Sequence, residues 1–270
     1  MRVRTAFIGA VVVALTALTG AVSSEAGLAD RVGATFSLMA DDFIKTSQPV
    51  EGTVVSLDEN QVFLDLGQGS GAQPGQELTV YRKGEAFQHP LTGKPLGRYE
   101  EHLGYAQIRR VFPQFSEATF VPVPDRPLPQ PGDGARVSRG RIKVAVTPLL
   151  DLTQSGADVR RVPYLIASAL ERSKRFVVMD PLAVADVFAG GTLKVEEVLA
   201  RPERAMRVAR NLEVAGWIVP VLIERQGALY LDATWISAIT GTPLFSRREI
   251  VLPSSTAEEQ RFPWEPRAED

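Results

Sequence analysis

Hydrophobic positions recur with the period of a helix near the start of the chain. Between Leu28 and Lys45 the apolar side chains lie three or four positions apart: Leu28, Val32, Phe36, Met39 and Phe43. Positions at this spacing share one face of a helix, so the pattern predicts an amphipathic helix. We expect its apolar stripe to pack on a neighbouring part of the chain; a helix that binds a partner is the alternative.

From residue 50 to residue 137 the period changes to two, and turn residues separate the apolar runs. Pro74-Gly75 and Pro131-Gly132 each precede a short apolar run. Proline fixes φ and the following glycine accepts the positive φ of a type II turn. With a hairpin over 50–66, the pattern predicts five or six short strands in a small closed or nearly closed β-barrel. A loop is expected over His89–Gly97.

Beyond Arg141 strands and helices alternate. The elements expected, in order, are a strand at 142–150, a helix at 162–173, a strand at 176–179, a helix capped by Asp180, a helix at 202–212, and strands at 217–223, 229–236 and 244–252. The last three predict an antiparallel meander, and helices on one face of this mixed sheet make an α/β sandwich. Pro220 has no N–H to donate, so its strand is expected at an edge or bulged. The fold class is α+β.

The first residues have the pattern of an export signal. Arg2 and Arg4 precede an uncharged run over 5–24, and small residues follow it. This order predicts a signal peptide cleaved after Ser23 or Ala26, and an uncleaved anchor is the alternative. The expected organisation is a signal peptide at 1–26, a helical segment at 27–46, the barrel at 47–140, the α/β part at 141–253 and a flexible tail at 254–270. Export to a bacterial periplasm follows as a hypothesis.

Composition sets limits on both the fold and the partners. The chain is 44% hydrophobic and 23% charged, which is enough apolar material for real cores. Its formal net charge of −2 gives no attraction to polyanions, so no nucleic-acid partner is expected. The chain has no cysteine, which excludes disulfides and a lipid-modified cysteine.

The sequence offers little chemistry. Gly67-Gln68-Gly69-Ser70-Gly71 follows a strand but lacks the glycine spacing and helix of a dinucleotide site. His89 and His102 are the only histidines, and they lie apart in loop-like sequence. We therefore assign no catalytic, cofactor-binding or metal-binding residue. Three phenylalanines are candidate partner contacts if they are exposed together: Phe112, Phe115 and Phe120.

Five signals in one order resemble the C-terminal module of flagellar assembly protein T. They are Gly52–Val55, Gly71–Arg82, Pro90–Gly97, Gly104–Ile108 and Phe115–Ala118. The resemblance covers about a third of the chain and implies an SH3-like barrel. In that family the α/β domain precedes the barrel, whereas here the barrel comes first.

The segment from Lys143 to Leu252 resembles the N-terminal domain of the Tol translocation protein B and the related curli-secretion-subunit family. The matching features are Thr147–Leu150, Arg175–Asp180, and Ala233–Ile236 followed by Thr240–Leu244. Neither resemblance implies catalytic residues or a cofactor.

These patterns lead to three hypotheses. The first is a non-enzymatic periplasmic adaptor or assembly factor of an envelope machine, such as the flagellar basal-body ring, that binds envelope proteins through barrel loops or an open sheet edge. The second is an envelope regulator or accessory factor of polysaccharide or fibre secretion or cell-wall synthesis. The third is an enzyme such as a hydrolase. A homo-oligomer is left open in each case.

Overall fold

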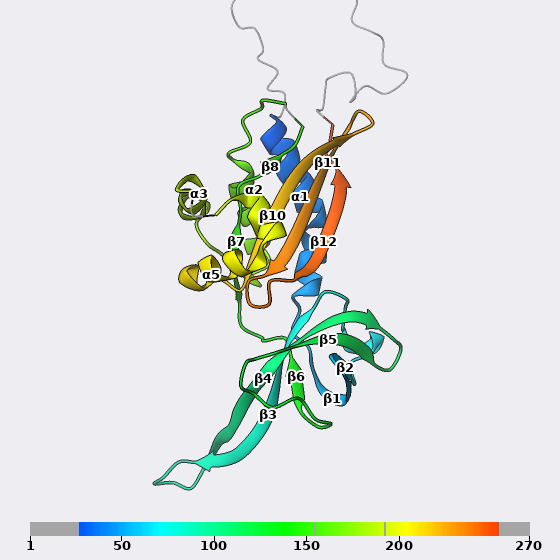
Figure 1. The fold of residues 1–270 in the computed structure, drawn as a ribbon, viewed down its shortest axis with the longest axis vertical. Helices are drawn as coiled ribbons and strands as arrows, with labels where there is room; N and C mark the ends of the chain where they lie inside the picture. The colour runs from blue at the N-terminus through cyan, green and yellow to red at the C-terminus, as the bar shows by residue number, and fades with distance from the viewer. Residues whose placement is uncertain (1–26, 154, 192, 254–270) are drawn as a thin grey trace, which may run out of the picture. The chain divides into compact units, whose positions relative to one another are not determined.

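The computed structural model describes residues 27–153, 155–191 and 193–253 (Figure 1). The predicted signal peptide at 1–26 and the predicted tail at 254–270 lie outside these residues. Residues Leu28–Pro253 form a single compact unit. The division of this unit into a barrel and an α/β domain, with the boundaries given above, stays a prediction.

Six strands close into a barrel, as the turn pattern predicts. They are β1 (Glu51–Asp58), β2 (Gln61–Leu64), β3 (Glu77–Gln88), β4 (Pro95–Val111), β5 (Ser116–Pro122) and β6 (Gly134–Arg136), with a 3₁₀ turn, η1, at Gln68–Ser70. Their order is β1-β2-β5-β4-β3-β6, and β6 closes the ring by pairing with both β1 and β3. Side chains such as Leu64, Leu78 and Ile108 fill the interior.

Two of these strands are much longer than predicted. β3 has 12 residues and β4 has 17, and their outer parts pair beyond the barrel as a two-stranded ribbon (Figure 1). The loop expected over His89–Gly97 is therefore wrong at its end, because β4 already begins at Pro95. None of the core clusters of the described residues includes a side chain of this ribbon, so its sequence does not show the alternation that marks the barrel strands.

The rest of the chain builds a mixed sheet with helices. The elements are β7 (Ile142–Val146), β8 (Leu150–Asp151), α2 (Val162–Glu171), β9 (Phe176–Val178), α3 (Pro181–Ala189), α4 (Val195–Ala200), α5 (Pro202–Leu212), β10 (Gly216–Arg225), β11 (Ala228–Ser237) and β12 (Pro243–Ile250). The order is β12-β11-β10-β7-β9, with β8 beside β10. β9, β7 and β10 run parallel, and β10, β11 and β12 form the predicted antiparallel meander. The α+β class is confirmed.

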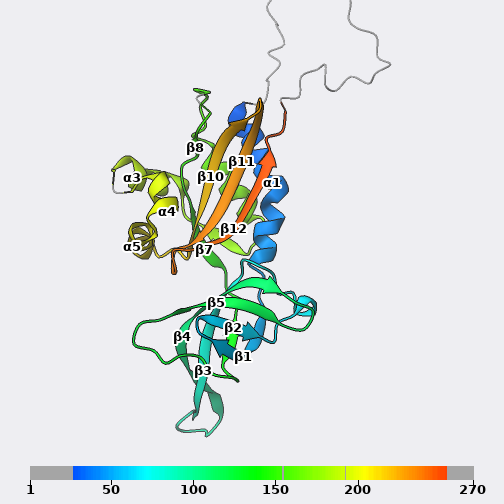
Figure 2. The ribbon, with the colours of Figure 1, turned by 45° about the vertical axis from the view of Figure 1, so that its right-hand side comes forward.

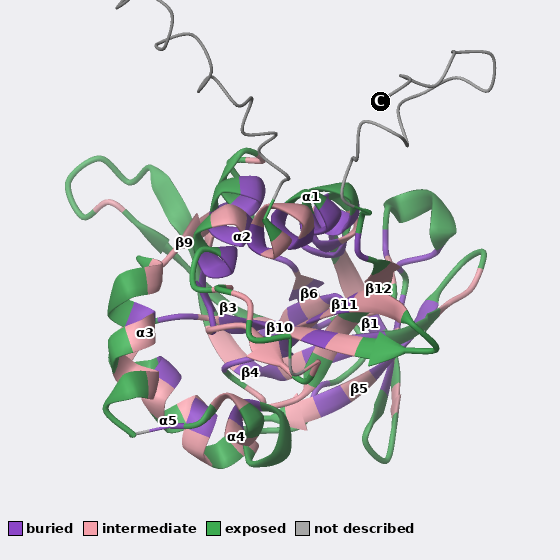
Figure 3. Cartoon of the chain, turned by 90° about the horizontal axis from the view of Figure 1, so that it is seen from above, coloured by how far each residue is buried: buried purple, intermediate pink, exposed green. Residues whose placement is uncertain are grey.

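Helices cover both faces of the sheet, not one face as predicted. α1 (Leu28–Thr46) and α2 share a core with Val144 and Val146, whereas α3, α4 and α5 pack on the face that includes Ala145 (Figures 2 and 3). Successive residues of a strand point to opposite faces, so the three consecutive buried residues of β7, Val144, Ala145 and Val146, require cover on both faces.

The helix stripe predicted at 28–45 is confirmed as a packing surface. Val32, Phe36 and Phe43 are fully buried against α2 and the sheet. Gly33 sits where α1 meets α2, and a Cβ built on it would lie 2.6 Å from Leu165 Cδ1. A glycine in mid-helix therefore permits the close approach of the two helices.

Pro220 lies inside the sheet, so its placement at an edge is wrong. β10 pairs with β7 up to Ile218 and with β8 from Val221. The carbonyls of Ile218 and Leu222 accept hydrogen bonds from this side. Residues two apart in a strand face the same neighbour, so Pro220 faces the gap between β7 and β8. Its missing N–H therefore costs no ladder hydrogen bond.

Candidate functional site

A half-buried glutamate, Glu77, lies where β3 and β4 of the barrel meet the turn between β11 and β12. Glu77 accepts hydrogen bonds from Gln107 Nε2 at 2.8 Å, Thr240 Oγ1 at 2.9 Å and Ser237 Oγ at 3.0 Å. Burial raises the pKa of Glu77 above its ordinary 4.5, and the three hydrogen bonds oppose that rise. Because these donors come from β4 and from the end of β11 with its turn, the carboxylate on β3 holds three segments together. No local pattern along the chain marks this group.

A buried guanidinium joins the points where the chain enters and leaves the barrel. Arg175, which is 7% exposed, donates from Nε to the carbonyl of Ser47 at 2.6 Å and from Nη2 to that of Ser138 at 2.6 Å. Its Nη1 donates to the carbonyl of Gly140. Burial lowers the pKa of Arg175. The planar fork of arginine suits three carbonyls in different directions, so the group has a structural explanation.

Both histidines have local structural contacts. His89 Nδ1 accepts from the N–H groups of Leu91 and Thr92, and His102 Nε2 lies 3.1 Å from the carbonyl of Gly104. Within the described ranges no three His, Cys, Asp or Glu side chains gather in a way that could hold a metal ion.

The structure brings together two of the three candidate phenylalanines. Phe112 and Phe115 stack with ring centroids 4.5 Å apart at the barrel surface, and Phe115 is 38% exposed. Phe120 is 4% exposed and belongs to the barrel core. Phe120 is therefore not part of an exposed patch. Partner contact by Phe112 and Phe115 stays a prediction.

An apolar groove of about 580 Å³ lies at the carboxyl edge of β7 and β9. It is lined mainly by Pro148, Leu149, Val159, Pro163, Tyr164 and Leu182. From β7 the chain continues through β8 to α2 on one face of the sheet, and from β9 it continues to α3 on the other. In open α/β sheets such a switch of faces leaves a crevice where ligands bind.

Among the described residues that line this groove, the charged side chains lie at its rim and are already paired. Arg160 Nη2 lies 2.6 Å from Asp158, and Arg161 Nη1 lies 3.4 Å from Asp30 of α1. By contrast Leu182, at 58% exposed, and Tyr164, at 46%, present apolar surface to solvent. The groove can therefore hold apolar side chains, and it offers few polar groups to orient a polar substrate.

Beyond the barrel, β3 and β4 form an exposed ribbon that we call the arm, residues 83–100. Every residue of the arm is exposed except His89, which is half-buried. It nevertheless carries four large apolar side chains: Phe87, Leu91, Leu96 and Tyr99. A two-stranded ribbon without a core is marginal by itself, so this length of apolar, uncovered ribbon indicates an interaction surface.

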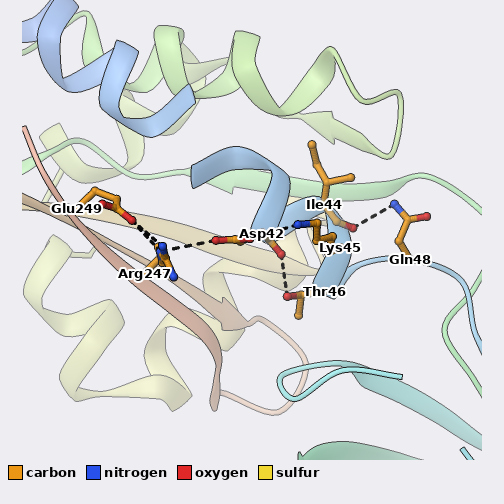
Figure 4. Close-up of polar contacts among 7 residues, drawn as sticks. All are labelled: Asp42, Ile44, Lys45, Thr46, Gln48, Arg247 and Glu249. Carbon is orange, nitrogen blue, oxygen red and sulfur yellow. Dashed lines mark hydrogen bonds and ion pairs between the residues drawn. The ribbon is translucent and has the colours of Figure 1, made fainter. Parts of the chain in front are cut away.

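The open edge of the sheet is less suited to binding by strand addition. On β12, Arg247 Nη2 lies 2.7 Å from Glu249, and its Nε lies 3.6 Å from Asp42 at the end of α1 (Figure 4). Arg248 pairs with Asp232 of β11. Charged side chains along an edge strand disfavour pairing with another chain.

Comparison with known proteins gives weak structural similarities only. No family model matches the chain, and no curated protein matches it. The LpoB C-terminal domain from Escherichia coli is 15% identical, with 42% of this chain and 83% of that chain covered at a TM-score of 0.35. The corresponding domain from Salmonella enterica is 15% identical, with 42% and 84% covered at 0.36.

Lipoprotein GNA1162 from Neisseria meningitidis is 16% identical, with 42% of this chain and 81% of that chain covered at a TM-score of 0.33. TM-scores this low do not establish a shared fold or a function. No helix among the described residues combines the length and apolarity that a membrane crossing requires.

Proposed function

We propose that this chain is a non-enzymatic accessory protein of the bacterial cell envelope that holds a protein partner through its surface. The observation that carries the proposal is the apolar groove at the carboxyl edge of β7 and β9. Its volume of about 580 Å³ lies within the range of ligand sites. The occupant is an extended segment of a partner protein that presents apolar side chains.

The lining of the groove supports a protein segment over a small polar substrate. A site for a polar substrate needs polar groups that converge on it. Here Arg160 and Arg161 lie at the rim, in ion pairs with Asp158 and Asp30. Tyr164 supplies a rigid apolar body with one hydroxyl, a combination typical of protein interfaces.

Glu77 and Arg175 support a structural role rather than catalysis. The Glu77 carboxylate is held by three side-chain donors, and each nitrogen of the Arg175 guanidinium is held by a backbone carbonyl. Groups engaged in this way tie segments together. A general acid or base needs an open position within reach of a reacting atom.

The envelope location rests on the export pattern in residues 1–26. The proposal has two versions, which differ in the partner. In the flagellar version the partner belongs to the basal-body ring, the barrel is SH3-like and related to flagellar assembly protein T, and residues 141–253 correspond to the N-terminal domain of the Tol translocation protein B. In the second version the partner belongs to cell-wall synthesis or to polysaccharide or fibre secretion.

A photo-crosslinking amino acid tests the groove in the living cell. Placed at Leu182, it should form an adduct with one protein of the envelope. The matched control is Leu199 on α4, which is 44% exposed and outside the groove. Leu182→Glu should abolish complementation of a deletion strain, whereas Leu199→Glu should preserve it. Full complementation by Leu182→Glu, with the same adducts at both positions, would refute the groove as the binding site.

The phenotype of the deletion strain separates the two versions. Loss of motility with normal resistance to wall-targeting antibiotics supports the basal-body partner. Normal motility and flagellation with hypersensitivity to these antibiotics, or with a loss of exported polysaccharide, supports the second version. A strain that is normal in all these respects contradicts both.

A further inference from the structure

The tip of the arm carries apolar side chains on a turn whose backbone is already hydrogen-bonded. Leu91 is 90% exposed and Leu96 is 57% exposed. His89 N–H donates to the carbonyl of Lys94 and Gly93 N–H to that of His89, both at 2.9 Å. His89 Nδ1 accepts from Leu91 N–H at 3.2 Å and from Thr92 N–H at 3.3 Å.

This internal pairing lowers the cost of taking the tip out of water. An unpaired backbone N–H is expensive to desolvate, and it finds few partners where the headgroups give way to hydrocarbon. Four N–H groups of the turn have partners within it, and Pro90 has none to offer. Leu91 can therefore enter a less polar environment without leaving these amides unpaired.

The arm is basic although the chain as a whole is acidic. Lys83, Lys94 and Arg98 lie with Glu85 and Glu100, and Glu100, which is opposite Lys83 in the ladder, is paired with Arg136 at 2.5 Å. The arm thus carries three positive charges against one uncompensated negative charge, on a chain of formal net charge −2. Its charge complements an anionic surface.

The aromatic side chains complete the pattern. Phe87 and Tyr99 lie against each other on the exposed ribbon, with ring centroids 4.9 Å apart and ring planes tilted by 39°, and Tyr99 is 66% exposed. An apolar tip, aromatic rings behind it and a collar of lysine and arginine are the features of elements that sit in the headgroup region of an anionic bilayer.

We propose that the arm binds the surface of a membrane containing anionic lipid, with Leu91 inserted among the headgroups and with Lys83, Lys94 and Arg98 against them. A second copy of the chain is a poorer occupant, because two identical basic arms repel each other. The arm could also bind an acidic protein surface, and the experiment below distinguishes that ligand from a membrane. The proposal does not depend on the groove.

Because the chain has no cysteine, one introduced cysteine can report insertion. The full chain, exported from a bacterial host, carries Leu91→Cys labelled with the polarity-sensitive dye NBD. It is titrated with vesicles of about 30% phosphatidylglycerol in phosphatidylcholine, and with pure phosphatidylcholine. The matched control is Leu128→Cys, which is 56% exposed on the barrel outside the arm.

Emission from the dye at residue 91 should rise and shift to the blue with anionic vesicles only, and emission at residue 128 should not change. In vesicle flotation, binding by the unlabelled chain should be at least tenfold greater with anionic lipid. Lys94→Glu/Arg98→Glu and Leu91→Glu should remove that excess, and Leu128→Glu should retain it.

All variants share one N-terminus, so membrane binding by residues 1–26 contributes equally to each. Equal flotation of all variants, or an unchanged emission at residue 91, would overturn the membrane proposal. If crosslinks from residue 91 then reach an acidic protein, the arm binds protein. None of these outcomes bears on the complementation test of Leu182.

Discussion

Substitution of Arg175 tests whether its guanidinium holds together the segment that enters the barrel, at Ser47, and the segment that leaves it, at 138–140. Arg175→Met keeps much of the side-chain volume but leaves three carbonyls without their donor. The carbonyl of Ser47 belongs to a residue that is 1% exposed, so water does not replace the lost donor easily. Ser138 and Gly140 are exposed, and their carbonyls can regain water.

The expected loss follows from these environments. Leaving the buried carbonyl unpaired costs about 1–3 kcal/mol, and two hydrogen bonds exchanged for water cost about 0.5–1.5 kcal/mol each. The free energy of unfolding should therefore fall by about 4 kcal/mol, a large part of the total for a typical domain. The free energy of unfolding of Arg175→Lys should lie between those of the wild type and of Arg175→Met, because one ammonium group cannot reach all three carbonyls.

Urea unfolding followed by tryptophan fluorescence measures this loss. With a slope of about 2.5 kcal/mol per molar urea, the midpoint should fall by about 1.5 M. Trypsin should also cleave faster after Arg139 and Arg141, which lie beside the released carbonyls. Arg207→Met, on the exposed side of α5, is the matched control. If Arg175→Met were as stable and as resistant to trypsin as this control, the guanidinium would not hold these segments.

Two further substitutions test the packing and the Glu77 carboxylate. The raised pKa of Glu77 means that, above its ordinary 4.5, the folded state holds a proton that the unfolded chain has lost. Stability should thus fall as the pH rises from 4.5 towards neutrality, and unfolding curves of Glu77→Gln should lack this dependence; an identical pH profile would contradict it. Gly33→Ala should cost about 1–3 kcal/mol in urea unfolding, because the new Cβ meets Leu165, although alanine favours a helix by about 1 kcal/mol. Gly69→Ala, with open space around it, should be near neutral; equal effects of the two would refute the close approach.

Features specified by neighbouring residues could be predicted from the sequence. The spacing from Leu28 to Phe43 predicted α1 almost to its ends. Asp180 was predicted to cap a helix, and its carboxylate accepts from Leu182 N–H at 3.0 Å. The helix over 202–212 was placed at its observed bounds. Each of these depends on contacts within a few positions along the chain.

The candidate sites were largely hidden from the sequence. The middle of the arm, His89–Gly97, was predicted as a loop, because a ribbon without a core carries no alternating pattern. The groove joins residues from the segment after β7, from α2 and from α3, and no local pattern marks their meeting. Phe120 resembles Phe112 and Phe115 in sequence, yet the barrel closes around Phe120 alone.

Local sequence was enough to specify the helical stripe, the turns of the barrel and the strands and helices other than α4 and β8, because these depend on spacing and backbone preference. Folding alone brought Glu77 to Ser237, 160 positions away, and Arg175 to Ser47, 128 positions away. It also fixed which apolar side chains are covered and which stay open to solvent. Burial depends on which distant elements arrive at one place, and a one-dimensional pattern carries no record of that meeting.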